Sequence, residues 1–257
     1  MKHPTITHLI LAFAVALLPA TALAQKQTES VDKNLPFPSG GTLKLNNFSG
    51  DVRITGGSGR NFVMKATRRG YPDVLREMQL TIESSGSTIT VDANHRDRDS
   101  QRWNDNDRRD NMVETTFEIE VPAGARLDIN VFSSDVTISG VDGDQRLKTF
   151  SGNIDVRDAR GMINANSFSG EIDVDATGQG TSPDLDMETF SGSMRVRLAD
   201  RARGNIEFNT FSGSFDAAYP VTLRTTTGRR NIRAELPGGS GSSLRFKSFS
   251  GELRLVR

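Results

Sequence analysis

The sequence predicts an all-β protein: a single elongated β-solenoid (β-helix-like) with short strands and a repeat of about 20 residues. Three observations predict it. The tripeptide Phe-Ser-Gly occurs six times in the chain, short segments of alternating apolar and polar residues flank the copies, and the copies that begin at Phe150, Phe168, Phe190 and Phe211 are almost evenly spaced. Period-two alternation indicates half-buried strands, and a period of roughly 20 residues is typical of stacked coils.

Residues 1–24 are predicted to form a secretory signal peptide. Lys2 supplies a positive start, Leu9 to Leu18 are uninterruptedly apolar, and Ala22-Leu23-Ala24 is a small-x-small pattern, so we expect cleavage between Ala24 and Gln25. The alternative is an uncleaved anchor, but the segment from Leu9 to Ala24 is shorter than the roughly 20 residues that span a bilayer. The mature chain contains no other long apolar run, so no transmembrane segment is expected after cleavage.

The first half of the mature chain is less regular. Residues 25–40 are polar and interrupted by Pro and Gly, which predicts a flexible lead-in to a single β-solenoid domain over residues 41–257. Within 41–121, one complete motif stands at residues 48–50. The other expected elements are a helical turn at Pro72–Glu77 and strands at Phe62–Ala66, Met78–Ile82, Thr88–Val91 and Thr116–Val121.

The segment 95–112 is of a different kind, with five Arg, five Asp and a single Trp. Balanced charge and few apolar anchors predict a surface loop. The functional alternative is a binding loop in which Trp103 is an aromatic platform and Arg102, Arg108 and Arg109 contact anions.

Residues 122–257 carry the regular coils, in which each motif marks a corner between two strands. Glycine suits a corner that requires an unusual backbone angle. Phe132-Ser133-Ser134 and Thr226-Thr227-Gly228 resemble degenerate copies. The predicted corner residues are Phe48, Gly50, Phe132, Phe150, Gly152, Phe168, Gly170, Phe190, Gly192, Phe211, Gly213, Phe249 and Gly251.

The phase of alternation changes between Thr149 and Phe150, so the side chain of the motif Phe has two possible locations. We favour the interior, where the rings would form a buried aromatic stack. The alternative leaves them outside as a row of exposed rings, an apolar patch large enough to indicate binding or assembly.

The outward positions of the strands carry side chains of mixed charge along the repeats, which indicates a solvated face with weak charge pairs between coils. Asp155 and Asp173 are expected on adjacent coils, with Arg195 next. Like charges side by side are unfavourable, so we expect Arg157, Arg195 or a bound cation to relieve them.

Composition excludes most familiar chemistry. The chain has no cysteine and three histidines, of which only His95 lies outside the leader. Without the leader, 31 basic and 32 acidic side chains remain, which is too balanced for non-specific nucleic-acid binding. Asn104 to Asp107 lack the glycine and distal glutamate of an EF-hand, and Gly238 to Gly241 are not followed by the Lys-Ser/Thr of a phosphate-binding loop. No catalytic, cofactor-binding or metal-binding residue is predicted.

Three segments also carry a family resemblance. Ser49 to Ile54 and Ser133 to Gly140 share a Gly/Ser-Asp-Val-x-Ile pattern after a corner, and Phe117 to Ala125 is similar to an entry into repeated coils. Over roughly residues 41–257 the chain resembles the adhesin-named family of bacterial β-strand-repeat domains, a domain family of unknown function. The resemblance implies the same fold and supplies no catalytic residues. Phe at the corners, where the family often has Val or another small residue, and the 95–112 insertion are departures from its pattern.

The expected function is that of a non-enzymatic exported protein, an adhesin or envelope-associated binding or structural module. It would be periplasmic or secreted and associated with the cell surface. The partner is unknown, and envelope glycans or surface proteins are the candidates. The alternatives are a glycan-cleaving β-helix enzyme that uses Asp155 and Asp173, and a scaffold that self-associates through its solenoid ends, where strand edges are unpaired.

Overall fold

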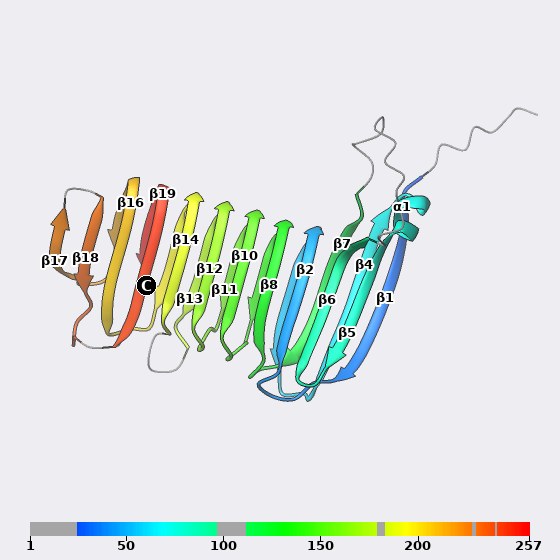
Figure 1. Ribbon diagram of the computed structural model, residues 1–257. Helices are drawn as coiled ribbons and strands as arrows, with labels where there is room; N and C mark the ends of the chain where they lie inside the picture. Colours follow the sequence, from blue (N-terminus) through cyan, green and yellow to red (C-terminus); the bar gives the residue numbers. More distant parts are fainter. Residues whose placement is uncertain (1–24, 97–111, 179–182, 228–229, 240) are drawn as a thin grey trace, which may run out of the picture.

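The computed structural model describes residues 25–96, 112–178, 183–227, 230–239 and 241–257. Nineteen strands form one mixed sheet that extends as an elongated row (Figure 1), which confirms the all-β prediction. The helix α1 covers Pro72–Glu77, where a helical turn was expected. The strands are β1 Gln27–Pro36, β2 Thr42–Ser49, β3 Val52–Gly57, β4 Asn61–Gly70, β5 Met78–Ser85, β6 Thr88–Arg96, β7 Glu114–Pro122, β8 Arg126–Ser133, β9 Val136–Ser139, β10 Gln145–Ser151, β11 Ile154–Arg157, β12 Ile163–Ser169, β13 Ile172–Ala176, β14 Leu185–Ser191, β15 Met194–Leu198, β16 Gly204–Ala217, β17 Thr222–Thr227, β18 Asn231–Glu235 and β19 Ser242–Val256.

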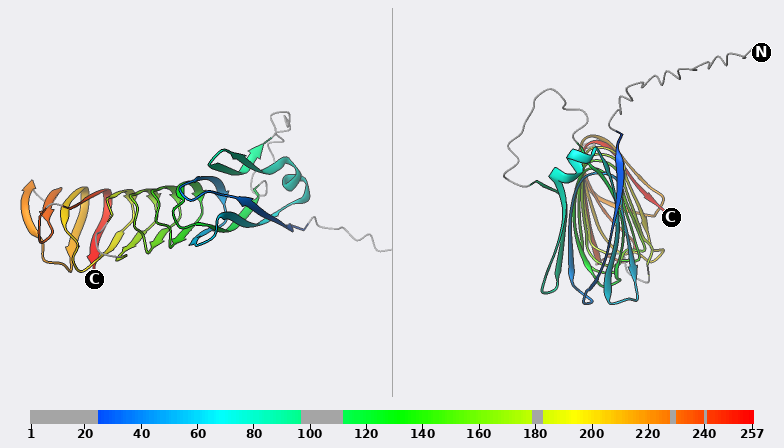
Figure 2. Two further views of the ribbon diagram at one scale, coloured as in Figure 1. Left: turned by 90° about the horizontal axis from the view of Figure 1, so that it is seen from below. Right: turned by 90° about the vertical axis from the view of Figure 1, so that its right-hand side faces the viewer.

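The central strands form two parallel rows that meet at the Phe-Ser-Gly corners. In one row β8, β10, β12 and β14 pair in parallel, and in the other β9, β11, β13 and β15 do so. Leu147 lies opposite Ala165, and Asn164 lies opposite Asp186, so the pairing follows the spacing of the motif. Viewed along the row, these strands lie one behind another (Figure 2, right).

The spatial order of the strands differs from their order in the chain. The C-terminal strand β19 lies between β14 and β15 on one side and β16 on the other, parallel to all three. Similarly, β2 pairs with both β6 and β8, and β3 pairs with both β7 and β9. The motif at residue 249 therefore lies between those at 190 and 211.

Antiparallel strands occupy both ends of the row. At one end β1 pairs with β4, and β4 pairs with β7. The prediction of a flexible lead-in over residues 25–40 is therefore wrong: the polar residues of Gln27–Pro36 form an edge strand, whose outer side faces water and does not require apolar residues. At the other end β17 is antiparallel to β18, so the copy expected at 226–228 is not a parallel coil.

The core is a narrow layer of alternating inward side chains between the two rows. Ile154 and Val156 from one row, and Leu147 and Ala165 from the other, are fully buried. Two short strands bury little on their own, so stacking supplies the stability. No helix in the described ranges is long and apolar enough to cross a membrane.

Candidate functional site: an exposed phenylalanine ridge

The phenylalanine of every motif points into solvent. The seven rings are between 38% exposed at Phe48 and 56% exposed at Phe211. The favoured prediction of an interior aromatic stack is therefore wrong, and the alternative, an exposed row, is correct. We call this row the phenyl ridge; in spatial order it consists of Phe48, Phe132, Phe150, Phe168, Phe190, Phe249 and Phe211.

Each ring points outward because its phenylalanine continues the outward phase of the strand, and the alternation breaks only at the next residue, which is also exposed. Thr149 is buried, Phe150 and Ser151 are both exposed, and Ile154 returns to the core. The backbone continues to pair between coils through the corner, since the Gly152 N–H donates to the Ser169 carbonyl at 3.2 Å. The ring is thus held on rigid, hydrogen-bonded backbone.

Glycine is required at these corners by close contact between coils. A Cβ on Gly152 would lie 2.1 Å from the Ser134 carbonyl oxygen, and one on Gly192 would lie 2.1 Å from that of Gly170. Real Cβ atoms do not approach backbone this closely. The glycine therefore lets successive corners stack directly, and this stacking brings the rings into register.

The rings stack face to face along the whole ridge. Neighbouring ring centroids are 4.7–4.9 Å apart, with interplanar angles of 1–7°. Beyond the last ring, the guanidinium of Arg230 lies 4.8 Å from the centroid of Phe211 and continues the stack as a cation–π contact. The ridge consequently presents ring edges to solvent, while most ring faces are covered by their neighbours.

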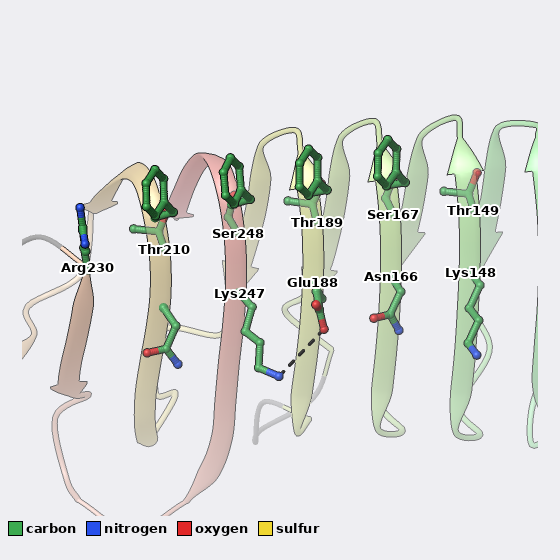
Figure 3. A pocket seen from close by; sticks show the side chains of 15 residues that line it. Lys148, Thr149, Asn166, Ser167, Glu188, Thr189, Thr210, Arg230, Lys247 and Ser248 are labelled. Carbon is green, nitrogen blue, oxygen red and sulfur yellow. Dashed lines mark ion pairs between the residues drawn. The ribbon is translucent and has the colours of Figure 1, made fainter.

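A shallow groove of about 790 Å³ runs beside the ridge. The phenyl rings form one wall, hydroxyl residues such as Thr189 form the floor, and side chains including Lys148 and Glu188 form the other wall (Figure 3). A second hollow of about 470 Å³ continues past Lys148 toward Phe48. The groove therefore follows the ridge across all seven coils.

The groove floor holds buried hydroxyl groups with no hydrogen-bond partner among the described residues. They belong to the inward residue immediately before the ridge phenylalanine in five coils. The first coil differs: the buried Asn47 side chain donates to the carbonyls of Gly50 at 2.8 Å and Thr115 at 2.9 Å. The five hydroxyl residues are Thr149, Ser167, Thr189, Ser248 and Thr210.

Two rows of outward side chains cross the same seven parallel strands, the first lining the groove and the second lying beyond it. The middle row lies two residues before each ridge phenylalanine, and the lower row lies four before it. We call the surface made by the ridge and both rows the ladder face. In spatial order the middle row is Asn46, Asn130, Lys148, Asn166, Glu188, Lys247 and Asn209, and the lower row is Lys44, Asp128, Arg146, Asn164, Asp186, Arg245 and Glu207.

The carboxylates considered for catalysis lie on the other row of strands. Asp155 is directly opposite Asp173, and Asp173 is opposite Arg195, as predicted. Arg157 Nη2 donates to Asp155 Oδ2 at 2.6 Å, and Arg195 Nη1 donates to Asp173 Oδ2 at 3.4 Å. Burial raises the pKa of Asp173 above its usual value, although Arg195 opposes the shift. Two arginines thus relieve the like-charge contact, as expected.

Other predicted site residues lie outside the described residues: Ala24 at the expected cleavage position, and Arg102, Trp103, Arg108 and Arg109 of the charged segment. Arg230 was missed, because it stands far from any complete motif. The hydroxyl floor could have been found from the Thr or Ser that precedes Phe in five copies. Within the described ranges, no group of three or more His, Cys, Asp or Glu side chains could hold a metal ion.

Comparison with solved structures shows the same fold. A proposed cell adhesion protein from Clostridium sporogenes superposes with a TM-score of 0.51 at 13% identity, covering 89% of this chain and 99% of that one. A proposed adhesin from Bacteroides fragilis (TM-score 0.44, 14% identity, 89% and 97%) and a proposed lipid-binding protein from Parabacteroides distasonis (TM-score 0.32, 10% identity, 91% and 98%) are more distant.

No curated protein matches the chain. Residues 28–255 match the family described as Toastrack DUF4097, a domain of unknown function. This match covers almost all of the sequence after the predicted leader and agrees with the family resemblance read from the corner motifs. The chain belongs to the Toastrack DUF4097 family.

Proposed function

We propose that this protein is a non-enzymatic, adhesin-like binding module of the cell envelope and that the ladder face is its binding surface. The observation that carries the proposal is the phenyl ridge, seven stacked and solvent-exposed rings in one line. Roughly half-exposed rings of this size present on the order of 600 Å² of apolar surface. That equals or exceeds the largest apolar patch of a typical monomer, and such patches mark interaction sites.

The ring geometry favours a protein surface over a glycan as the partner. Sugars bind aromatic residues through the ring faces, whereas here each inner ring has neighbours within 4.9 Å on both faces. The accessible part is a row of apolar edges beside a polar groove. A partner with an apolar strip and flanking polar groups fits this surface better than a saccharide chain.

We further propose that the paired rows form a β-solenoid with a repeat of about 20 residues and that the protein is exported to the periplasm or the cell surface. The parallel register between strands of successive motifs supports the first point. The leader-like residues 1–24 support the second. The description of the Clostridium sporogenes neighbour as a proposed adhesion protein is in line with this assignment.

Glycan cleavage by Asp155 and Asp173 has less support. A glycosidase requires one carboxyl group free to donate a proton and a second free to act as base or nucleophile. Here Asp155 is held by two hydrogen bonds from Arg157, and Asp173 forms an ion pair with Arg195. These contacts account for both carboxylates as members of ion pairs, Asp155 within its own strand and Asp173 with the neighbouring strand.

The test is binding of the purified protein, residues 25–257, to cell-envelope fragments of the source organism. We expect the variant Phe150→Ser/Phe168→Ser/Phe190→Ser to lose most of this binding while retaining its fold. The matched control is Met162→Ser/Leu223→Ser, which removes two similarly exposed apolar side chains that lie away from the ridge. Equal binding by both variants would show that the ridge is not the binding surface.

A further inference from the structure

We propose that the partner of the ladder face is a second copy of this chain. The two copies would pack face to face, ridge against ridge, about a two-fold axis that runs parallel to the strands through the coil of Asn166 and Phe168. This inference rests on the proposed function, because it names the partner of that same surface. It is carried by the order of charges across the seven strands.

The lower row is self-complementary about its centre. In spatial order its signs are plus, minus, plus, neutral, minus, plus, minus, with Asn164 in the middle. A two-fold axis through Asn164 reverses this order on the second copy. Each charge then meets its opposite; the pairs are Lys44 with Glu207, Asp128 with Arg245, and Arg146 with Asp186.

The middle row obeys the same symmetry. About Asn166, Lys148 of one copy lies opposite Glu188 of the other, and this contact occurs twice. The remaining positions place Asn130 opposite Lys247 and Asn46 opposite Asn209, so like charges never meet. Opposite charges arranged in this way fix the register of an interface and exclude alternatives.

A shift by one coil in either direction removes this complementarity. In one direction Lys148 would face Lys247 and Arg146 would face Arg245. In the other, Lys44 would face Arg245 and Asp128 would face Asp186. The register that avoids like charges is also the one in which all seven rings of both ridges overlap, since Phe168 is the fourth of the seven.

The shape and size of the ladder face suit such a contact. The interplanar angles of 1–7° between neighbouring rings mean that the ridge runs nearly straight. Both ridges have the same ring spacing, so they can remain in contact along their whole length. The rings alone offer on the order of 600 Å² per copy, and the two polar rows raise the contact area to the roughly 800 Å² per partner of a standard interface.

Sedimentation velocity of residues 25–257 tests the proposal. We expect the wild-type chain to form dimers in a concentration-dependent manner. Lys148→Glu alone creates two Glu–Glu contacts in the dimer, and Glu188→Lys alone creates two Lys–Lys contacts, so each variant should dimerise at least about tenfold more weakly. Lys148 has only Asn130 and Asn166 as row neighbours in its own chain, so its substitution disturbs the monomer little.

The decisive sample is an equimolar mixture of the two single variants. In a heterodimer, the glutamate introduced at position 148 meets the lysine introduced at position 188, and the unchanged Glu188 of one copy meets the unchanged Lys148 of the other. The mixture should therefore dimerise more strongly than either variant alone. Lys33→Glu, a matched charge reversal on the edge strand β1, should dimerise like the wild type. A mixture that stays monomeric would overturn the proposal, as would a wild-type chain that is monomeric at every concentration.

The two proposals fail separately. A monomeric protein that still binds envelope fragments through its ridge would refute the dimer and leave the binding function intact. A protein that dimerises but does not bind envelope fragments would refute the binding function and leave the dimer intact. Ridge-dependent binding of the monomeric protein to phospholipid vesicles would identify a lipid surface as the occupant and would also refute the dimer.

Discussion

Gly170 stacks directly on Gly152: a Cβ placed on Gly170 would lie 2.1 Å from the carbonyl oxygen of Gly152. This single contact explains why the third residue of the motif is glycine and why the ring centroids of Phe150 and Phe168 lie only 4.8 Å apart. The two corners cannot separate to admit a methyl group without breaking the hydrogen bond from the Gly152 N–H to the Ser169 carbonyl, at 3.2 Å.

Gly170→Ala should therefore destabilise the protein strongly, by about 3 kcal/mol or more, because the clash is with backbone and has no flexible atom to move. Urea unfolding followed by circular dichroism measures the effect. Gly59→Ala is the control: the nearest atom to its added Cβ is 4.0 Å away, so the change should stay within about 0.5 kcal/mol. Equal effects at the two positions would contradict the stacked-corner explanation.

The ridge should matter little for folding. Phe168→Ala removes a ring that is 47% exposed, so we expect a loss of about 1–2 kcal/mol, from its two stacking contacts. Phe246→Ala removes a fully buried ring and should cost about 3–5 kcal/mol. Thermal unfolding of both variants measures the two losses of stability. If Phe168→Ala lost as much stability as Phe246→Ala, the ridge would serve stability and not binding.

The repeat spacing predicted the parallel register of the two rows of strands, because the seven motifs share the same alternation and six of them carry the corner glycine. It could not predict that β19 lies between β14 and β16, since coils with identical motifs can stack on one another in any order. The direction of the phenyl rings was also undetermined. The phase of alternation changes between Thr149 and Ile154, and a period-two pattern does not show whether Phe150 continues the outward phase of Lys148, as it does, or takes the inward phase of Ile154.

Arg230 is a site residue that the repeat pattern could not predict, for a different reason. It reaches the ridge from the residue just before β18, a strand without a motif, and covers the exposed face of Phe211. Only the antiparallel return of β17 and β18 brings it there. The sequence showed that the ladder face carries charges of mixed sign, but the symmetry of these charges depends on the spatial order of β19 and β16, which the sequence does not reveal.

Asn47 should be a strong stabilising residue. Its amide is buried and donates to three backbone carbonyls, those of Ser49, Gly50 and Thr115, so it joins β2 to the neighbouring coil. Asn47→Ala would remove the buried donor that these carbonyls share, and we expect a loss of about 2–3 kcal/mol in the free energy of unfolding. Asn46→Ala, a change at the partly exposed neighbour, should cost much less in the same urea titration.

For the hydroxyl groups of the groove floor we predict that removal does not lower the stability, in contrast to removal of the Asn47 amide. Thr189 is buried, and its hydroxyl has no hydrogen-bond partner among the described residues. Thr189→Val keeps the shape and removes the unsatisfied hydroxyl, so it should be neutral or stabilise by up to about 1 kcal/mol. Val131 already occupies the equivalent position of another coil. A clear destabilisation in differential scanning calorimetry would show that the hydroxyl is bonded after all.

Asp175 gives the protein a defined response to acid. Burial tends to raise its pKa, but hydrogen bonds from the Thr177 side chain, from Arg197 and from the Thr177 backbone outweigh burial and hold the pKa below its usual value. A carboxyl group whose folded-state pKa is lowered stabilises the protein above its unfolded pKa, and this contribution disappears as the pH falls through the folded-state pKa.

Asp175→Asn should accordingly lower stability at pH 7 by a few tenths to about 1 kcal/mol, because the pair with Arg197 is partly solvent-exposed and screened. The difference from wild type should shrink as the pH falls below about 4.

Asp173 should respond to pH in the opposite direction. Its pKa is raised by burial, so its contribution is fully present below its unfolded pKa and is lost as the pH rises through the folded-state pKa. Urea titrations of the wild type, Asp175→Asn and Asp173→Asn across this range should therefore give stability differences of opposite slope, and parallel slopes would contradict the assignment of the two environments.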